Sequence, residues 1–91
     1  MQKSIHSSFA KAICDHLKKL REEAGMTQRD LASALKREHG MVARMELGER
    51  RVDLAEAYWV FHALRTDPAV EVSKLMRRFE EIAGEEAKEG G

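Results

Sequence analysis

Cysteine, proline and aromatic residues are all scarce in this 91-residue sequence. A single cysteine, Cys14, excludes an internal disulfide framework and favours a reducing compartment. With one proline and few Val or Thr residues, the composition favours helices over a sheet. The longest uncharged apolar stretch, residues 57–64, is too short to cross a bilayer, and the first residues lack the apolar run of a signal peptide. We therefore expect one all-α domain of a cytoplasmic protein, with no membrane partner.

Neither sign of charge is in excess, because 16 Lys and Arg residues balance 16 Asp and Glu residues. The two ends of the chain nevertheless differ. Residues 1–52 carry 11 basic and 7 acidic side chains, a balance of +4, whereas residues 53–91 carry 5 and 9, a balance of −4. A basic half followed by an acidic half is expected when one face of a protein meets a polyanion.

Helical periodicity appears first over about residues 8–24. Five apolar side chains repeat there on one face: Phe9, Ile13, Leu17, Leu20 and Ala24. Ser7 or Ser8 can cap the start of this helix, and Gly25 can end it in a left-handed conformation.

Two short helices are expected next, over about residues 28–47. Thr27 can cap the first by accepting the backbone N–H of Asp30, and Gly48 can end the second. Their inner faces hold Leu31, Ala32 and Leu35 on one helix and Val42 and Met45 on the other. The connection is only three or four residues long, so the helices must cross steeply, and the small Ala32 allows a close approach. This spacing predicts a helix-turn-helix.

A fourth helix is expected from Asp53, which forms a capping box with Glu56. Its expected apolar stripe comprises Leu54, Ala57, Tyr58, Phe61 and Leu64. Asp67 and Pro68 are suited to start a fifth helix over about residues 68–83. The apolar seam of that helix comprises Val72, Leu75, Met76, Phe79 and Ile82. Residues 1–83 would then form one domain, followed by a flexible tail over residues 84–91.

The stretches Met26–Leu35 and Val42–Arg51 resemble the phage-repressor and Cro-like helix-turn-helix family, also called the XRE family. The resemblance covers about residues 9–66. Nine positions fall in register: Arg21, Thr27, Gln28, Leu31, Ala32, Leu35, Val42, Glu46 and Gly48. It implies a five-helix, lambda-repressor-like fold and a transcriptional regulator that binds double-stranded DNA sequence-specifically.

The resemblance also implies roles for individual residues. The third helix would lie in the major groove, and the positions facing base edges are His39, Gly40, Ala43 and Arg44. Arg44 is the strongest candidate, because its planar fork can bind guanine O6 and N7 together. Phosphate contacts are expected from Gln28, Lys36, Arg37, Arg50 and Arg51. Arg21 and Glu46 match a partly buried ion pair that ties the first helix to the third.

Three residues depart from the family pattern. Lys36 occupies a turn position that is commonly Gly, where a positive φ would cost on the order of 1 kcal/mol. Glu38 replaces a Ser, Thr or Pro and is poorly placed near phosphates, and Gly40 replaces a residue that often contacts DNA. Base recognition would then depend on Arg44 and His39, with DNA shape supplying the remainder.

The seam of the fifth helix has two interpretations: it packs back on its own domain, or it meets a second copy of the chain. The resemblance and DNA geometry favour a homodimer that binds a palindromic operator, with half-sites about one duplex turn (~34 Å) apart. The predicted dimer interface is then Val72, Leu75, Met76, Phe79 and Ile82. The alternative function is an antitoxin or adaptor that binds a partner protein, such as a toxin, through the fifth helix and the acidic tail.

No enzyme, metal or other cofactor is predicted. Cys14 and His16 are two residues apart, and such residues point about 200° away from each other on a helix. Adjacent carboxylates along the chain are likewise splayed, and nothing near Cys14 in the sequence provides a base for a nucleophile. Tyr58, Trp59 and Phe61 could form a stacking platform for single strands. Their spacing instead favours Tyr58 and Phe61 in the core and Trp59 in an interface.

Overall fold

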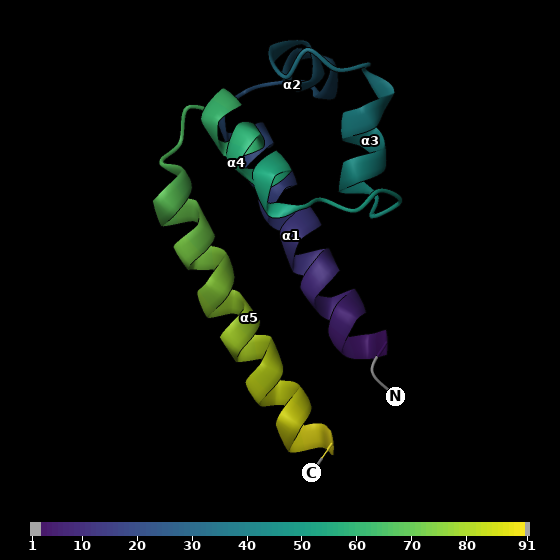
Figure 1. Cartoon of the computed structure of the whole chain (residues 1–91), viewed down its shortest axis with the longest axis vertical. Coiled ribbons are helices and arrows are strands. Elements are labelled where there is room, and N and C mark those ends of the chain that lie inside the picture. The colour runs from purple at the N-terminus through teal and green to yellow at the C-terminus, as the bar shows by residue number, and fades with distance from the viewer. Residues whose placement is uncertain (1–2, 91) are drawn as a thin grey trace.

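A computed structural model describes residues 3–90 of the chain, with side chains for residues 8–88. Five helices follow one another: α1 (Lys3–Glu23), α2 (Gln28–Ala34), α3 (Gly40–Glu46), α4 (Leu54–Ala63) and α5 (Pro68–Gly90). No strand occurs in this part of the chain, so the predicted all-α fold is confirmed. The long helices α1 and α5 run side by side in opposite directions, and α2 and α3 lie at the end of the molecule away from both termini (Figure 1).

The predicted helix caps are confirmed at three starts and two stops. Thr27 and Asp53 each form a complete capping box at the starts of α2 and α4. Asp67 Oδ1 accepts the backbone N–H of Ala69 at 3.0 Å, at the start of α5. Gly25 and Gly48 have φ values of +72° and +78°, which only glycine adopts without strain. Residues close in sequence therefore set most helix boundaries.

Two non-glycine residues, Lys36 and Arg65, also adopt positive φ, at 58° and 62°. Lys36 lies in the turn between α2 and α3, and Arg65 lies between α4 and α5. The positive φ that the sequence analysis considered for Lys36 is therefore present. Nothing in the sequence indicated the positive φ of Arg65.

Replacing Lys36 by glycine is expected to raise the free energy of unfolding by about 0.5–1 kcal/mol. The glycine would remove the clash between Cβ and the backbone at positive φ, offset in part by greater freedom of the unfolded chain. Urea denaturation followed by circular dichroism would measure the change. Lys36→Ala, which keeps the Cβ, is the control and should not stabilise; equal stability of the glycine and wild-type chains would contradict the prediction.

The core lies where α1, α2, α3 and α4 meet, with α5 closing one side. Its largest fully buried side chains are Leu17, Leu31, Val42, Met45, Val60 and Phe61. The prediction for α4 was wrong at Leu54 and Tyr58, which are 71% and 45% exposed. Ala57, Phe61 and Leu64 are buried as predicted, and Val60 completes the buried face. Because Val60 belongs to the buried face of α4, the centre of that face is rotated around the helix axis, away from Leu54 and Tyr58.

Both long helices extend beyond their predicted ends. The helix α1 begins at Lys3, so the predicted start at Ser7 or Ser8 is wrong, and both serines lie within the helix. The helix α5 continues through Gly84 to Gly90, so the predicted end at Gly84 is also wrong. A glycine within a helix costs only about 1 kcal/mol relative to alanine, which neighbouring residues can offset.

The helix α5 packs back along α1. Leu75 and Ile82 of its seam are 6% and 5% exposed, and the ring of Phe79 stacks on Phe9 with centroids 4.6 Å apart. This corrects the predicted dimer interface, because Leu75 and Ile82 are buried within their own chain. Val72 is half-buried, and only Met76 of the seam is exposed. Among residues 3–90, no helix is long and apolar enough to cross a membrane.

Candidate nucleic-acid interface

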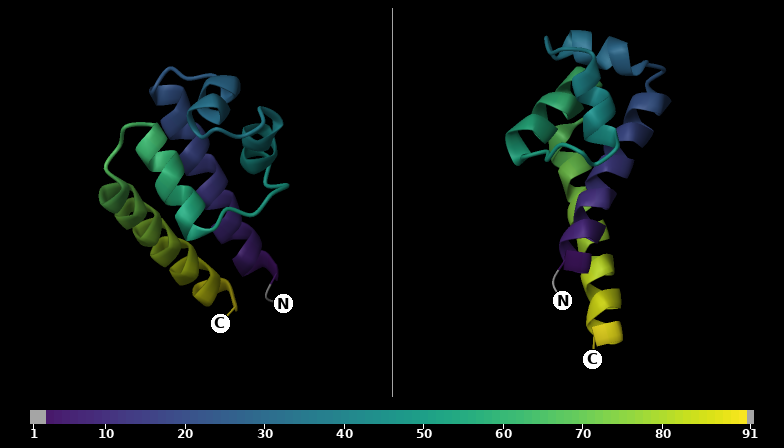
Figure 2. Two further views of the ribbon diagram at one scale, coloured as in Figure 1. Left: turned by 45° about the horizontal axis from the view of Figure 1, so that its top comes forward. Right: turned by 90° about the vertical axis from the view of Figure 1, so that its right-hand side faces the viewer.

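The helices α2 and α3 pack against each other across a short turn (Figure 2). Leu31 and Ala32 of α2 are buried, as are Val42 and Met45 of α3, which matches the predicted inner faces. Met41 of α3 is also buried, although the sequence analysis did not include it. This packing fixes α3 by one face and leaves its other face toward solvent.

A polar network ties α3 to α1 and α2. Arg21 Nε donates to Glu46 Oε2 at 2.6 Å, and Arg21 Nη2 donates to Glu46 Oε1 at 3.1 Å. Gln28 Nε2 donates to the same Oε1 at 2.9 Å, and Arg21 Nη1 donates to the carbonyl of Met26 at 2.7 Å. The hydrogen bond with Glu46 raises the pKa of Arg21 above its ordinary value. The structure thus brings together the ion pair that the family resemblance implied, and Gln28, which the resemblance also implied to hold the third helix in place, binds the same carboxylate.

The outer side of α3 holds the four residues expected to face base edges. His39 precedes the helix and is exposed, and its side chain makes no capping hydrogen bond. Gly40 and Ala43 are half-buried, and the side chain of Arg44 is 46% exposed. His39 and Ala43, Gly40 and Ala43, and Gly40 and Arg44 are three or four residues apart, so the four positions lie on one surface. This surface, His39 with Gly40, Ala43 and Arg44, is called the α3 face below.

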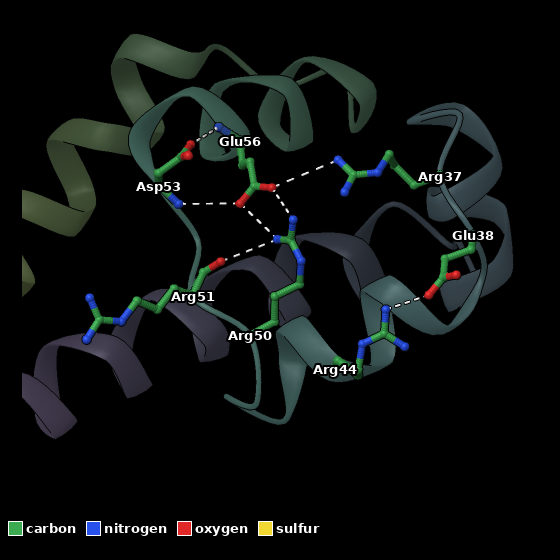
Figure 3. A network of polar contacts seen from close by, with 7 residues as sticks. All are labelled: Arg37, Glu38, Arg44, Arg50, Arg51, Asp53 and Glu56. Atoms are coloured by element: carbon green, nitrogen blue, oxygen red, sulfur yellow. Dashed lines mark hydrogen bonds and ion pairs between the residues drawn. The ribbon is translucent and has the colours of Figure 1, made fainter.

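Arg44 on the α3 face is paired with Glu38 (Figure 3). Arg44 Nη2 donates to Glu38 Oε1 at 2.5 Å. The hydrogen bond and the charge of Arg44 lower the pKa of Glu38 below its ordinary value. The sequence analysis described Glu38 as poorly placed near phosphates but did not predict this pair.

The basic residues expected to contact phosphates do not all lie together. Arg50 binds Glu56 through two hydrogen bonds, of 2.9 and 2.5 Å, and its Nη1 also donates to the backbone carbonyl of Arg51. Arg37 Nη1 lies 3.9 Å from the same carboxylate. Lys36 is exposed in the turn before α3. Figure 3 shows the side chain of Arg51 pointing away from Arg44 and Arg37.

Glu56 therefore has a role that the sequence analysis missed. It closes the capping box of α4 and also binds Arg50, which fixes the connection between α3 and α4. These hydrogen bonds raise the pKa of Arg50 and lower the pKa of Glu56. Arg50 and Glu56 are six residues apart across an irregular segment, so no helical spacing could have identified the pair.

His16 and Cys14 lie on α1 and not on the α3 face. Among the described residues, no group of three His, Cys, Asp or Glu side chains could hold a metal ion. His16 Nε2 lies 2.8 Å from Glu71 Oε1, which joins α1 to α5. Cys14 is buried, and burial raises the pKa of its thiol above the ordinary value, so the thiolate is disfavoured there.

The two short helices are joined by a tight turn, and the second is exposed on one face and held by buried residues on the other. This arrangement defines a helix-turn-helix domain. A family model described as a helix-turn-helix domain matches residues 12–74. The chain also resembles the solved structure of an XRE-family like protein from Pseudomonas syringae pv. tomato str. DC3000. The two are 36% identical with a TM-score of 0.78, and the match covers 85% of this chain and 94% of that chain.

The chain belongs to the XRE family of helix-turn-helix proteins, as the sequence predicted. No curated protein matches it. Membership of this family supports a DNA-binding regulator in general terms, and the fold is typical of regulators that are not enzymes.

Proposed function

We propose that the protein is a transcriptional regulator that binds double-stranded DNA sequence-specifically, with α3 in the major groove. The observation that supports this most is the α3 face, which is open to solvent while the opposite side of the helix is buried. A helix held in this way can enter the groove as a rigid element, since a major groove admits an α-helix. Arg44 is the base-contacting residue we propose first, because guanine offers two acceptors that match its guanidinium.

Phosphate contacts remain proposed for the exposed cations around α3. Lys36 and Arg37 lie in the turn that precedes it, and Arg51 follows it. Arg50 and Gln28 already donate to the carboxylates of Glu56 and Glu46, so a phosphate would have to be bound through their remaining N–H groups. We therefore propose that these two residues act mainly by holding the surrounding structure in place.

We also propose that the regulator acts as a homodimer on a palindromic operator, because two-fold symmetry would place two α3 helices on one side of the duplex. Leu75 and Ile82 are buried, so a second copy would contact other apolar side chains. The large apolar side chains exposed on α4 and α5 are Leu54, Tyr58, Trp59, Val70 and Met76. The adaptor alternative uses the same seam of α5, so the burial of Leu75 and Ile82 counts against that docking surface as well.

Binding of fluorescent duplexes at several salt concentrations tests the proposed function. We expect affinity for duplex DNA to fall as salt rises, with a slope of roughly −0.9 for each phosphate contacted. A single strand of the same length is the matched control, and we expect it to bind more weakly because it lacks a major groove. Absence of binding to any duplex at low salt would contradict the proposal.

A further inference from the structure

We propose that Glu38 competes with the operator for Arg44: it holds the guanidinium until a guanine in the operator replaces the carboxylate as the acceptor, and so limits discrimination. This inference rests on the proposed function. Glu38 then acts on recognition through Arg44, and not only through the repulsion between its own charge and the phosphates.

The first observation is the position of the Arg44 guanidinium. Its Nη2 is bonded to Glu38, and its Nη1 lies 3.1 Å from the place where a Cβ on residue 40 would stand. The guanidinium therefore lies back across the first turn of α3, over the only residue of the α3 face that has no side chain. The absence of a side chain at Gly40 provides the space for this arrangement.

The second observation is that the pair is accessible. The side chains of Arg44 and Glu38 are 46% and 69% exposed, so DNA on the α3 face can reach both. The pair is an exposed one, and such pairs are weak enough to be exchanged for a better partner. A buried pair such as Arg21 with Glu46 would not exchange in this way.

Exchange has a cost, because Arg44 must leave the Glu38 carboxylate before it can reach a base. A guanine in the correct position can offset this cost, since it offers O6 and N7 to the same planar fork. On a non-cognate duplex the pair can stay closed, so the cost is not incurred there. Glu38 should therefore weaken binding to the operator more than binding to non-cognate DNA.

The test uses the full chain and measures dissociation constants for a selected operator and for a non-cognate duplex, at one salt concentration and pH 7. We expect Glu38→Gln to tighten binding to both duplexes, and to tighten the operator complex about threefold more, a factor typical of an exposed ion pair. In an Arg44→Ala background the extra factor should vanish. Glu49→Gln, which makes the same change of charge just after α3, should leave the ratio of the two constants unchanged.

Equal tightening of both complexes by Glu38→Gln, with and without Arg44, would overturn the inference, because Glu38 would then act by charge alone. NMR titration of the Glu38 carboxyl gives a readout without DNA. Its pKa should lie below the ordinary glutamate value and return toward it in Arg44→Ala; an unchanged pKa would also overturn the inference. Failure of the wild-type chain to bind any duplex would instead overturn the proposed function, whatever the titration shows.

Discussion

Replacing Glu46 by alanine should lower the free energy of unfolding by about 3–5 kcal/mol, the usual cost of leaving one partner of a buried ion pair alone. The side chain of Glu46 is 3% exposed and that of Arg21 is 10% exposed, so water cannot readily replace the lost carboxylate. Gln28 would lose its acceptor as well. Urea denaturation followed by circular dichroism would measure the loss.

Two further variants separate burial from charge. Glu49→Ala removes an exposed carboxylate three residues later and is expected to change stability by no more than about 0.5 kcal/mol. Combining Arg21→Met with Glu46→Leu should cost less than Glu46→Ala alone, because no buried charge is left unpaired. A loss below about 1 kcal/mol for Glu46→Ala would show that the network does not hold α3 in place.

The second large effect is expected on recognition. Discrimination is the ratio of the dissociation constants of a duplex that lacks one operator guanine and of the operator itself. Arg44→Ala should reduce this ratio by about 5- to 150-fold, which corresponds to roughly 1–3 kcal/mol. The loss should be confined to that base pair, because a phosphate contact would weaken all complexes alike. The ratio of the two dissociation constants, at fixed salt, is the quantity to measure.

Arg77→Ala is the matched control for this prediction. Arg77 is exposed on α5, and Figure 1 shows α5 on the side of the molecule away from α3. Its removal changes the net charge equally but should leave the ratio unchanged. Undiminished discrimination by Arg44→Ala would remove this arginine from base recognition.

The helix-turn-helix and three of the helix starts could be predicted from sequence because their causes are local. Thr27 and Asp53 cap helices through residues three positions away, and Gly25 and Gly48 stop helices through their own backbone conformation. The pair of Arg21 and Glu46 spans 25 positions, and it was expected only because the family resemblance implied it.

Other features depend on distant packing or on irregular segments. Whether the α5 seam meets α1 or a second chain is not encoded in its periodicity, which is the same in both cases. Periodicity likewise could not place Tyr58 outside the core, because several rotations of α4 bury a similar number of apolar residues. The pairs of Arg44 with Glu38 and of Arg50 with Glu56 form across non-helical connections, where charge spacing carries no regular signal.

Selection of bound sequences from a random duplex pool, at fixed salt, tests the central claim that α3 recognises bases in the major groove. With the wild-type chain, the pool should converge on a motif that contains a guanine at a defined position. With Arg44→Ala, the preference for that guanine should be lost while the other positions are retained. A pool that stays random, or the same motif from both chains, would contradict the claim.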